Sequence, residues 1–184
     1  YFSQSLRYGG GREVAIALAE FYVQTSNFIE AVRVYQYLLR FEENVQPVYN
    51  NIGTSLMYGG KYIDAESYLL LAQQMDPKDP VPYLNLGALY DYHIRNRPRA
   101  IRFYECYLAL SPNESQETRQ VATRLHEFSF EGQADTSRVN LTCGEVYRPG
   151  VQPRHDLQAI FDLEFGEEDT ETSQEPTPII VERF

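Results

Sequence analysis

The chain contains 184 residues, carries a formal net charge of −10 and is 43% hydrophobic, which suits one domain with a packed core and an added tail. No apolar run reaches the length of a transmembrane helix, and the acidic balance argues against general nucleic-acid binding. The chain begins at Tyr1, which we interpret as a processed terminus or a fragment. Cytoplasmic, periplasmic and organellar locations all stay open.

An internal repeat organises the first part of the chain, with a period of about 34 residues. The segment 49–53 (YNNIG) aligns with 83–87 (YLNLG), and the resulting units are 12–45, 46–79 and 80–114, the last with one added residue before Ala100. Within each unit, apolar residues recur at spacings of three or four on either side of a short turn. This pattern predicts a pair of amphipathic helices in each unit.

Glycines occur inside two of these predicted helices, where glycine costs about 1 kcal/mol relative to alanine. They are Gly53 and Gly87, one period apart. We expect each to permit close approach of the paired helix, with Ala31, Ala65 and Ala100 as the small facing residues.

These residues resemble the pattern of the tetratricopeptide repeat family. Unit two matches at Tyr49, Ile52-Gly53, Leu56, Ala65, Leu69, Ala72 and Pro77; unit three at Tyr83, Leu86-Gly87, Tyr90, Ala100, Tyr104, Tyr107 and Pro112; and unit one at Ala15, Leu18-Ala19, Tyr22, Ala31, Tyr35 and Leu38, with Glu43 in place of the proline. The resemblance implies an all-α fold, a right-handed α-solenoid of helix–turn–helix repeats.

Residues 115–130 are predicted to form one further amphipathic helix that caps the repeats. Ser115 is a candidate N-cap, with Thr118 in the first turn, and the apolar face comprises Val121, Leu125 and Phe128. Residues 1–11 are expected to be a lead-in to the first helix.

Residues 131–184 are expected to form an acidic, extended tail. The last fifty residues hold 11 acidic and 4 basic side chains, and therefore most of the net charge. A short helix is predicted near 156–165, and its apolar stripe is a candidate recognition element for a partner or for the repeats: Leu157, Ile160, Phe161 and Phe165.

No catalytic or metal-binding motif emerges. The histidines (His93, His126 and His155) are far apart in the sequence, and we interpret Cys106 as a free, buried cysteine. Cys143 falls in the tail, and two cysteines are too few for a disulfide scaffold or, without a histidine cluster, for a structural zinc site. We therefore expect no enzyme activity, no cofactor and no bound metal.

A partner-binding face is expected on the first helices of the repeats. Its candidate residues are Asn50, Asn51, Thr54, Tyr58, Asn85, Asp91 and Tyr92. The family resemblance implies that Asn51 and Asn85 contact a peptide, although an asparagine there can also be a tolerated polar residue. The positions where some family members hold acidic chaperone tails carry no cation, since they are Ile16, Glu20, Val81 and Asn85.

An arginine-rich turn has two interpretations. Arg95, Arg97, Arg99 and Arg102 form either a solvated turn or a docking point for an acidic segment, from this chain's tail or from a partner.

These observations predict a non-catalytic scaffold or assembly factor that binds a protein or peptide on its concave face. The alternative is a structural subunit of a larger complex, anchored by its C-terminal tail.

Overall fold

The computed structural model describes residues 11–40, 42–130, 132 and 134–148. The chain divides after Pro153 into two units, and all described residues belong to the first. They form an all-α structure, with no strand among them. None of the described helices is both long enough and apolar enough to cross a membrane.

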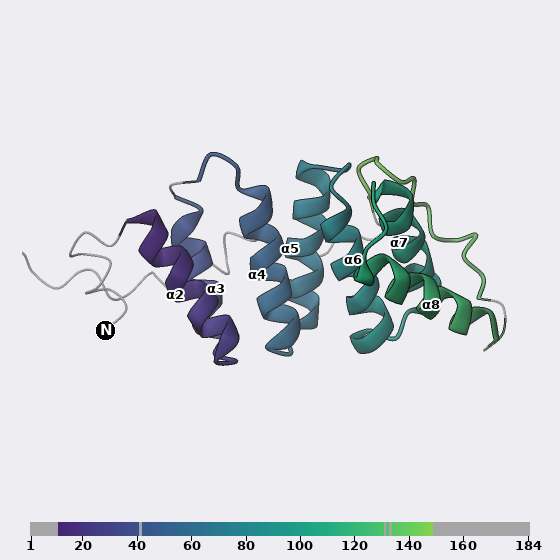
Figure 1. Ribbon diagram of the computed structural model, residues 1–184, viewed down its shortest axis with the longest axis horizontal. Helices are drawn as coiled ribbons and strands as arrows, with labels where there is room; N and C mark the ends of the chain where they lie inside the picture. Colours follow the sequence, from purple (N-terminus) through teal and green to yellow (C-terminus); the bar gives the residue numbers. More distant parts are fainter. Residues whose placement is uncertain (1–10, 41, 131, 133, 149–184) are drawn as a thin grey trace, which may run out of the picture. The chain divides into compact units, whose positions relative to one another are not determined.

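Two helices lie in each of the three predicted units (Figure 1). They are α2 (Arg12–Gln24) with α3 (Phe28–Leu38), α4 (Gln46–Tyr58) with α5 (Tyr62–Met75), and α6 (Pro80–Ala88) with α7 (Arg97–Leu110). Each second helix also contacts the first helix of the next pair, so that α3 packs on α4 and α5 packs on α6. The core therefore continues from one pair to the next.

The glycines inside α4 and α6 do allow close helix packing, but against other residues than we expected. A Cβ atom at Gly53 would lie 2.6 Å from Cγ of Leu69, and one at Gly87 would overlap the ring of Tyr104. Leu69 and Tyr104 lie one helical turn after the alanines of the sequence prediction, Ala65 and Ala100. The alanines themselves are fully buried.

A residue with left-handed backbone conformation ends each inter-helix turn: Ser26 (φ 60°), Gly60 (φ 79°) and Arg95 (φ 61°). Ser26 and Gly60 are one repeat period apart. Gly60 and Arg95 are one position further apart than that, so the added residue of the third unit lies before Arg95. The π-helical turn η1 (Leu89–His93) lies in that interval. Because a π-helical turn takes one residue more than an α-helical turn, η1 absorbs the insertion.

The helix after the repeats is α8 (Gln116–Phe130), which packs on α7. Reciprocal hydrogen bonds begin it as predicted, because the Thr118 amide donates to Oγ of Ser115 and the Ser115 amide donates to Oγ1 of Thr118. Val121 and Phe128 are buried as expected.

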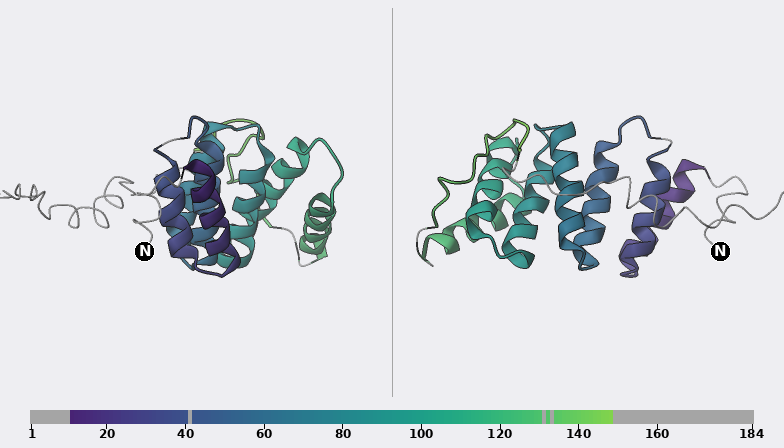
Figure 2. Two further views of the ribbon diagram at one scale, coloured as in Figure 1. Left: turned by 60° about the vertical axis from the view of Figure 1, so that its left-hand side comes forward. Right: turned by 180° about the vertical axis from the view of Figure 1, so that it is seen from behind.

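The sequence interpretation of Cys106 as a free cysteine is wrong. Cys106 of α7 forms a disulfide with Cys143, their Cα atoms being 4.9 Å apart. Residues 134–148, which we call the strap, return from the end of α8 to α7. The two cysteines are 37 positions apart in the sequence and meet only because of this return. In Figure 2, α8 and the strap lie beside α6 and α7, at the end of the described helices opposite to α2.

Side chains of the helices hold the backbone of the strap. The amide of Gln73 donates to the carbonyl oxygen of Glu145 at 2.6 Å and accepts from the amide of Tyr147 at 3.0 Å. The Tyr147 ring packs edge-on against Phe103, and Leu141 is also buried. Residues 134–148 of the predicted tail are therefore held against the repeats.

Candidate functional site

The predicted partner-binding residues fall on α4, α6 and η1, the first helices of the second and third repeats. We call their solvent-exposed side the first-helix face. Asn51 is exposed, and Thr54 and Asn85 are partly exposed. Tyr58 and Tyr92 are 60% and 55% exposed, and they are one period apart. In the third repeat Tyr83, Tyr90 and Phe103 are fully buried, so Tyr92 is displayed whereas these aromatic residues form the core.

Asn50 is not displayed, contrary to our expectation. It is buried, and its Oδ1 accepts a hydrogen bond of 2.9 Å from Nδ2 of Asn85. The backbone carbonyl of Asn50 also accepts from Oγ1 of Thr54. The contact between Asn50 and Asn85 joins α4 directly to α6 and fixes the orientation of the Asn85 amide. Among the described residues, nothing donates to the Oδ1 atom of Asn85.

Asp91 is likewise committed to an internal contact. Its carboxylate is buried and accepts two hydrogen bonds of 2.8 Å from Arg124 of α8, while the Tyr104 hydroxyl lies 3.4 Å from it. This bidentate ion pair ties α8 to η1. Burial, reinforced by the adjacent carboxylate, raises the pKa of Tyr104, and the carboxylates beside Arg124 raise the pKa of its guanidinium group. The Asp91 carboxylate is therefore engaged in an internal contact between η1 and α8.

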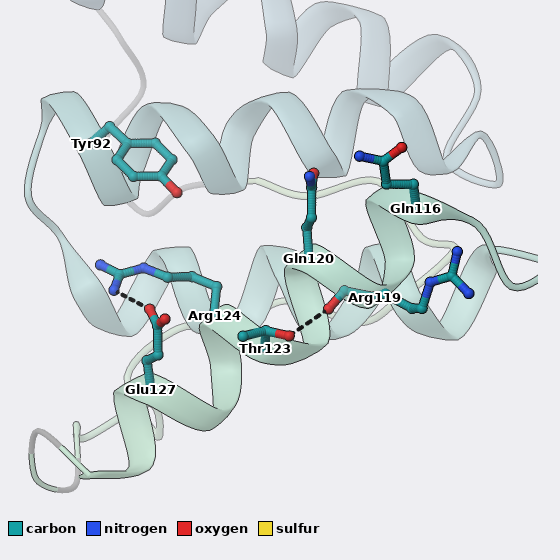
Figure 3. A pocket seen from close by; sticks show the side chains of 7 residues that line it. All are labelled: Tyr92, Gln116, Arg119, Gln120, Thr123, Arg124 and Glu127. Carbon is teal, nitrogen blue, oxygen red and sulfur yellow. Dashed lines mark hydrogen bonds and ion pairs between the residues drawn. The ribbon is translucent and has the colours of Figure 1, made fainter.

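A hollow of about 420 Å³ lies between η1 and α8 (Figure 3). Tyr92 contributes one wall, and the other residues come from one side of α8: Gln116, Arg119, Gln120, Thr123, Arg124 and Glu127. The Arg124 guanidinium lies over the Phe128 ring at 4.3 Å and donates to Glu127 at 2.9 Å. Carboxamide, guanidinium, hydroxyl and phenol groups thus line one continuous recess.

Sequence reasoning missed the α8 residues of this hollow. It treated the helix as a cap, and the regular polar side of an amphipathic helix carries no signal that distinguishes a binding wall from a solvated face. Only the docking of α8 beside η1 places the polar residues of α8 and Tyr92 around one hollow.

The four arginines of the third turn do not form a single free patch. Arg97 donates to the carbonyl oxygens of Phe128 and Gly132. Arg99 pairs with Glu66 at 3.2 Å. Arg102 pairs with Glu105 and donates to the carbonyl oxygen of Leu141 in the strap at 2.9 Å. Arg95 is exposed.

Arg97 and Arg102 therefore hold the end of α8 and the strap, whereas Arg99 joins α7 to α5. The candidate recognition residues of the tail, Leu157, Ile160, Phe161 and Phe165, lie outside the described residues.

No group of three or more potential metal ligands occurs among the described residues. No model of a protein family matches the chain, and no curated protein is significantly similar to it.

Proposed function

We propose that this chain is a tetratricopeptide-type α-solenoid that acts as a non-catalytic scaffold, binding a protein or peptide partner on the first-helix face. The alternation of helix pairs, the regular repeat period and the glycines at close helix contacts support the repeat assignment.

The observation that carries the binding proposal is the repetition of displayed side chains along this face. Asn51 and Tyr58 on α4 recur one period later as Asn85 and Tyr92. Exposed tyrosine offers a large contact area together with a hydroxyl group, and an asparagine amide can both donate to and accept from a peptide backbone. A ligand lying across α4, α6 and η1 would therefore meet the same pair of side chains twice, one repeat period apart.

The rigidity of the face favours binding further. The Asn50–Asn85 hydrogen bond orients one amide before any ligand arrives, and the Asp91–Arg124 ion pair fixes the distance between η1 and α8. Pre-organised groups lose less conformational entropy on binding.

Site-specific photo-crosslinking in the native cell tests this proposal. A photoreactive phenylalanine analogue replaces Tyr58 or Tyr92, and the matched control replaces Ile63, which is 65% exposed on the second helix α5. We expect one partner protein to be crosslinked from the two tyrosine positions and not from Ile63. Equal capture from all three positions, or none from the tyrosines, would refute the proposal.

The same experiment, repeated with a chain ending at Pro153, separates the two functional hypotheses. This truncation keeps the disulfide and the strap, which a chain ending at Gly132 would remove. If the crosslinks persist, the first-helix face is the binding site. If they vanish, the residues after Pro153 anchor the partner and the structural-subunit alternative is favoured.

A further inference from the structure

Both cysteines of the chain are used in one bond. Cys106 lies on α7 and is 0% exposed, whereas Cys143 lies on the strap and is partly exposed. The sequence contains two cysteines in all, so the disulfide between them leaves no free thiol. The thiol chemistry of this chain is therefore committed entirely to attaching the strap to the third repeat.

A turn in the strap presents Cys143 to α7. The amide of Glu145 donates to the carbonyl oxygen of Thr142 at 3.3 Å. Inside this turn, Gly144 has a φ of 80°, a left-handed conformation that glycine adopts without strain. The amide of Gly144 also donates to the hydroxyl oxygen of Tyr83 at 3.3 Å, which ties the turn to α6.

Further contacts hold the strap on both sides of Cys143. Before it, Arg102 donates to the carbonyl oxygen of Leu141 at 2.9 Å. After it, Gln73 donates to the carbonyl oxygen of Glu145 at 2.6 Å. None of these contacts involves a sulfur atom, so they also bring the two thiols together in the reduced chain. Thiols held side by side in this way react with each other at a high effective concentration.

The burial of the bond argues for a structural disulfide and against a redox sensor. Cysteines that sense oxidants are solvent-accessible, whereas Cys106 is fully buried. Structural disulfides form and persist in oxidising compartments and are rare in the cytosol, where glutathione and thioredoxin keep thiols reduced. The bond therefore carries information about where the chain matures.

We propose that Cys106 and Cys143 are the substrate site of a thiol–disulfide oxidase, and that the chain acquires this bond in an oxidising compartment. The oxidant is the C-x-x-C disulfide of that enzyme, which exchanges with thiols through a mixed disulfide. This proposal concerns the maturation of the chain and does not depend on the proposed function.

The difference in exposure sets the order of the two exchange steps. The thiolate of Cys143, the more accessible cysteine, attacks the disulfide of the oxidase, and one oxidase sulfur leaves as a thiolate. The thiolate of Cys106 then attacks the Cys143 sulfur, and the second oxidase sulfur leaves. Two protons and two electrons are thus lost from the thiols of the chain, and the oxidase disulfide becomes a dithiol.

Thiol labelling of the full chain in its native cell tests the compartment. Cells are quenched in acid, free thiols are blocked with N-ethylmaleimide, and the chain is then reduced and labelled with maleimide-polyethylene glycol. We expect two labels per chain, visible as a gel shift, and none when the reduction is omitted. The control Cys143→Ala should carry no label, because its remaining thiol is blocked in the first step.

Two results would overturn the proposal. Blocking of both thiols before reduction would show that the native chain is reduced. Equal oxidation of the full chain when it is produced in a reducing cytosol would show that neither the oxidase nor the oxidising compartment is required.

The order of the steps is tested with purified full-length Cys106→Ala and Cys143→Ala, using glutathione disulfide as the probe and mass spectrometry as the readout. We expect Cys106→Ala, which keeps the accessible thiol, to form the mixed disulfide about tenfold faster or more. In concentrated urea the two rates should converge, because both thiols are then exposed. Equal rates in the folded chains, or a difference that persists in urea, would refute an order set by burial.

Discussion

Removal of the Cys106–Cys143 disulfide is expected to destabilise the unit mainly through the unfolded state. The bond closes a loop of 37 residues that contains the whole of α8. In the chain-entropy account, a cross-link of this span raises the free energy of unfolding by about 4 kcal/mol at 25 °C. The double substitution Cys106→Ala/Cys143→Ala should therefore cost about 3–4 kcal/mol.

The folded state should keep the strap in place without the disulfide, because side chains hold it independently. Leu141 and Tyr147 are only 4% and 5% exposed, and Gln73 makes two hydrogen bonds to the strap backbone. The disulfide-free protein should thus retain native hydrogen-exchange protection of the strap. Tyr147→Ala, with the disulfide intact, should by contrast cost about 3 kcal/mol through loss of buried aromatic packing.

Urea and thermal unfolding, each followed by circular dichroism, measure these changes with and without a dithiol reductant. For a unit of this size, we expect the melting temperature to fall by roughly 8–15 °C. The reductant should lower the stability of the original chain to that of the double variant and leave the variant unchanged. A change below about 0.5 kcal/mol in both comparisons would refute the loop-closure reasoning. A loss well above about 5 kcal/mol would refute the independent attachment of the strap.

Three further predictions concern the helices. Gly53→Ala should lower the free energy of unfolding by about 1–2 kcal/mol, because the added Cβ would lie 2.6 Å from Cγ of Leu69. This loss is expected although alanine is the better helix former. A higher midpoint in urea denaturation would contradict the close packing of α4 on α5. Arg124→Met should lower the free energy of unfolding by about 2–3 kcal/mol, because it removes the ion-pair partner of the buried Asp91 carboxylate. The control Arg119→Met, at an exposed position of the same helix, should change it by less than about 0.5 kcal/mol. Equal effects of the two substitutions in thermal melts would be inconsistent with the ion pair. Because burial and the neighbouring carboxylate raise the pKa of Tyr104 above its ordinary value of 10.0, the folded state retains this proton at higher pH than the unfolded state, so stability is full below pH 10 and falls as the pH rises further. Tyr104→Phe should make that alkaline decline shallower in pH-dependent unfolding, and an unchanged slope would rule out this contribution.

The sequence was sufficient to predict the helices and their pairing in the chain. A regular repeat period and apolar spacings of three and four are local properties, so they identify two helices per unit and a further helix after them. Ser115 and Thr118 begin α8 as predicted, since a capping interaction involves neighbouring residues only. The single added residue of the third unit was also visible, although its accommodation in the π-helical turn η1 was not.

Contacts between distant segments were decided by the tertiary structure alone. Whether Cys106 is free or bonded depends on the return of the chain after α8, and whether Asp91 is displayed or buried depends on where Arg124 docks. Periodicity determines which side chains share a face of a helix, whereas the packing of other helices determines whether that face meets solvent, the core or a partner.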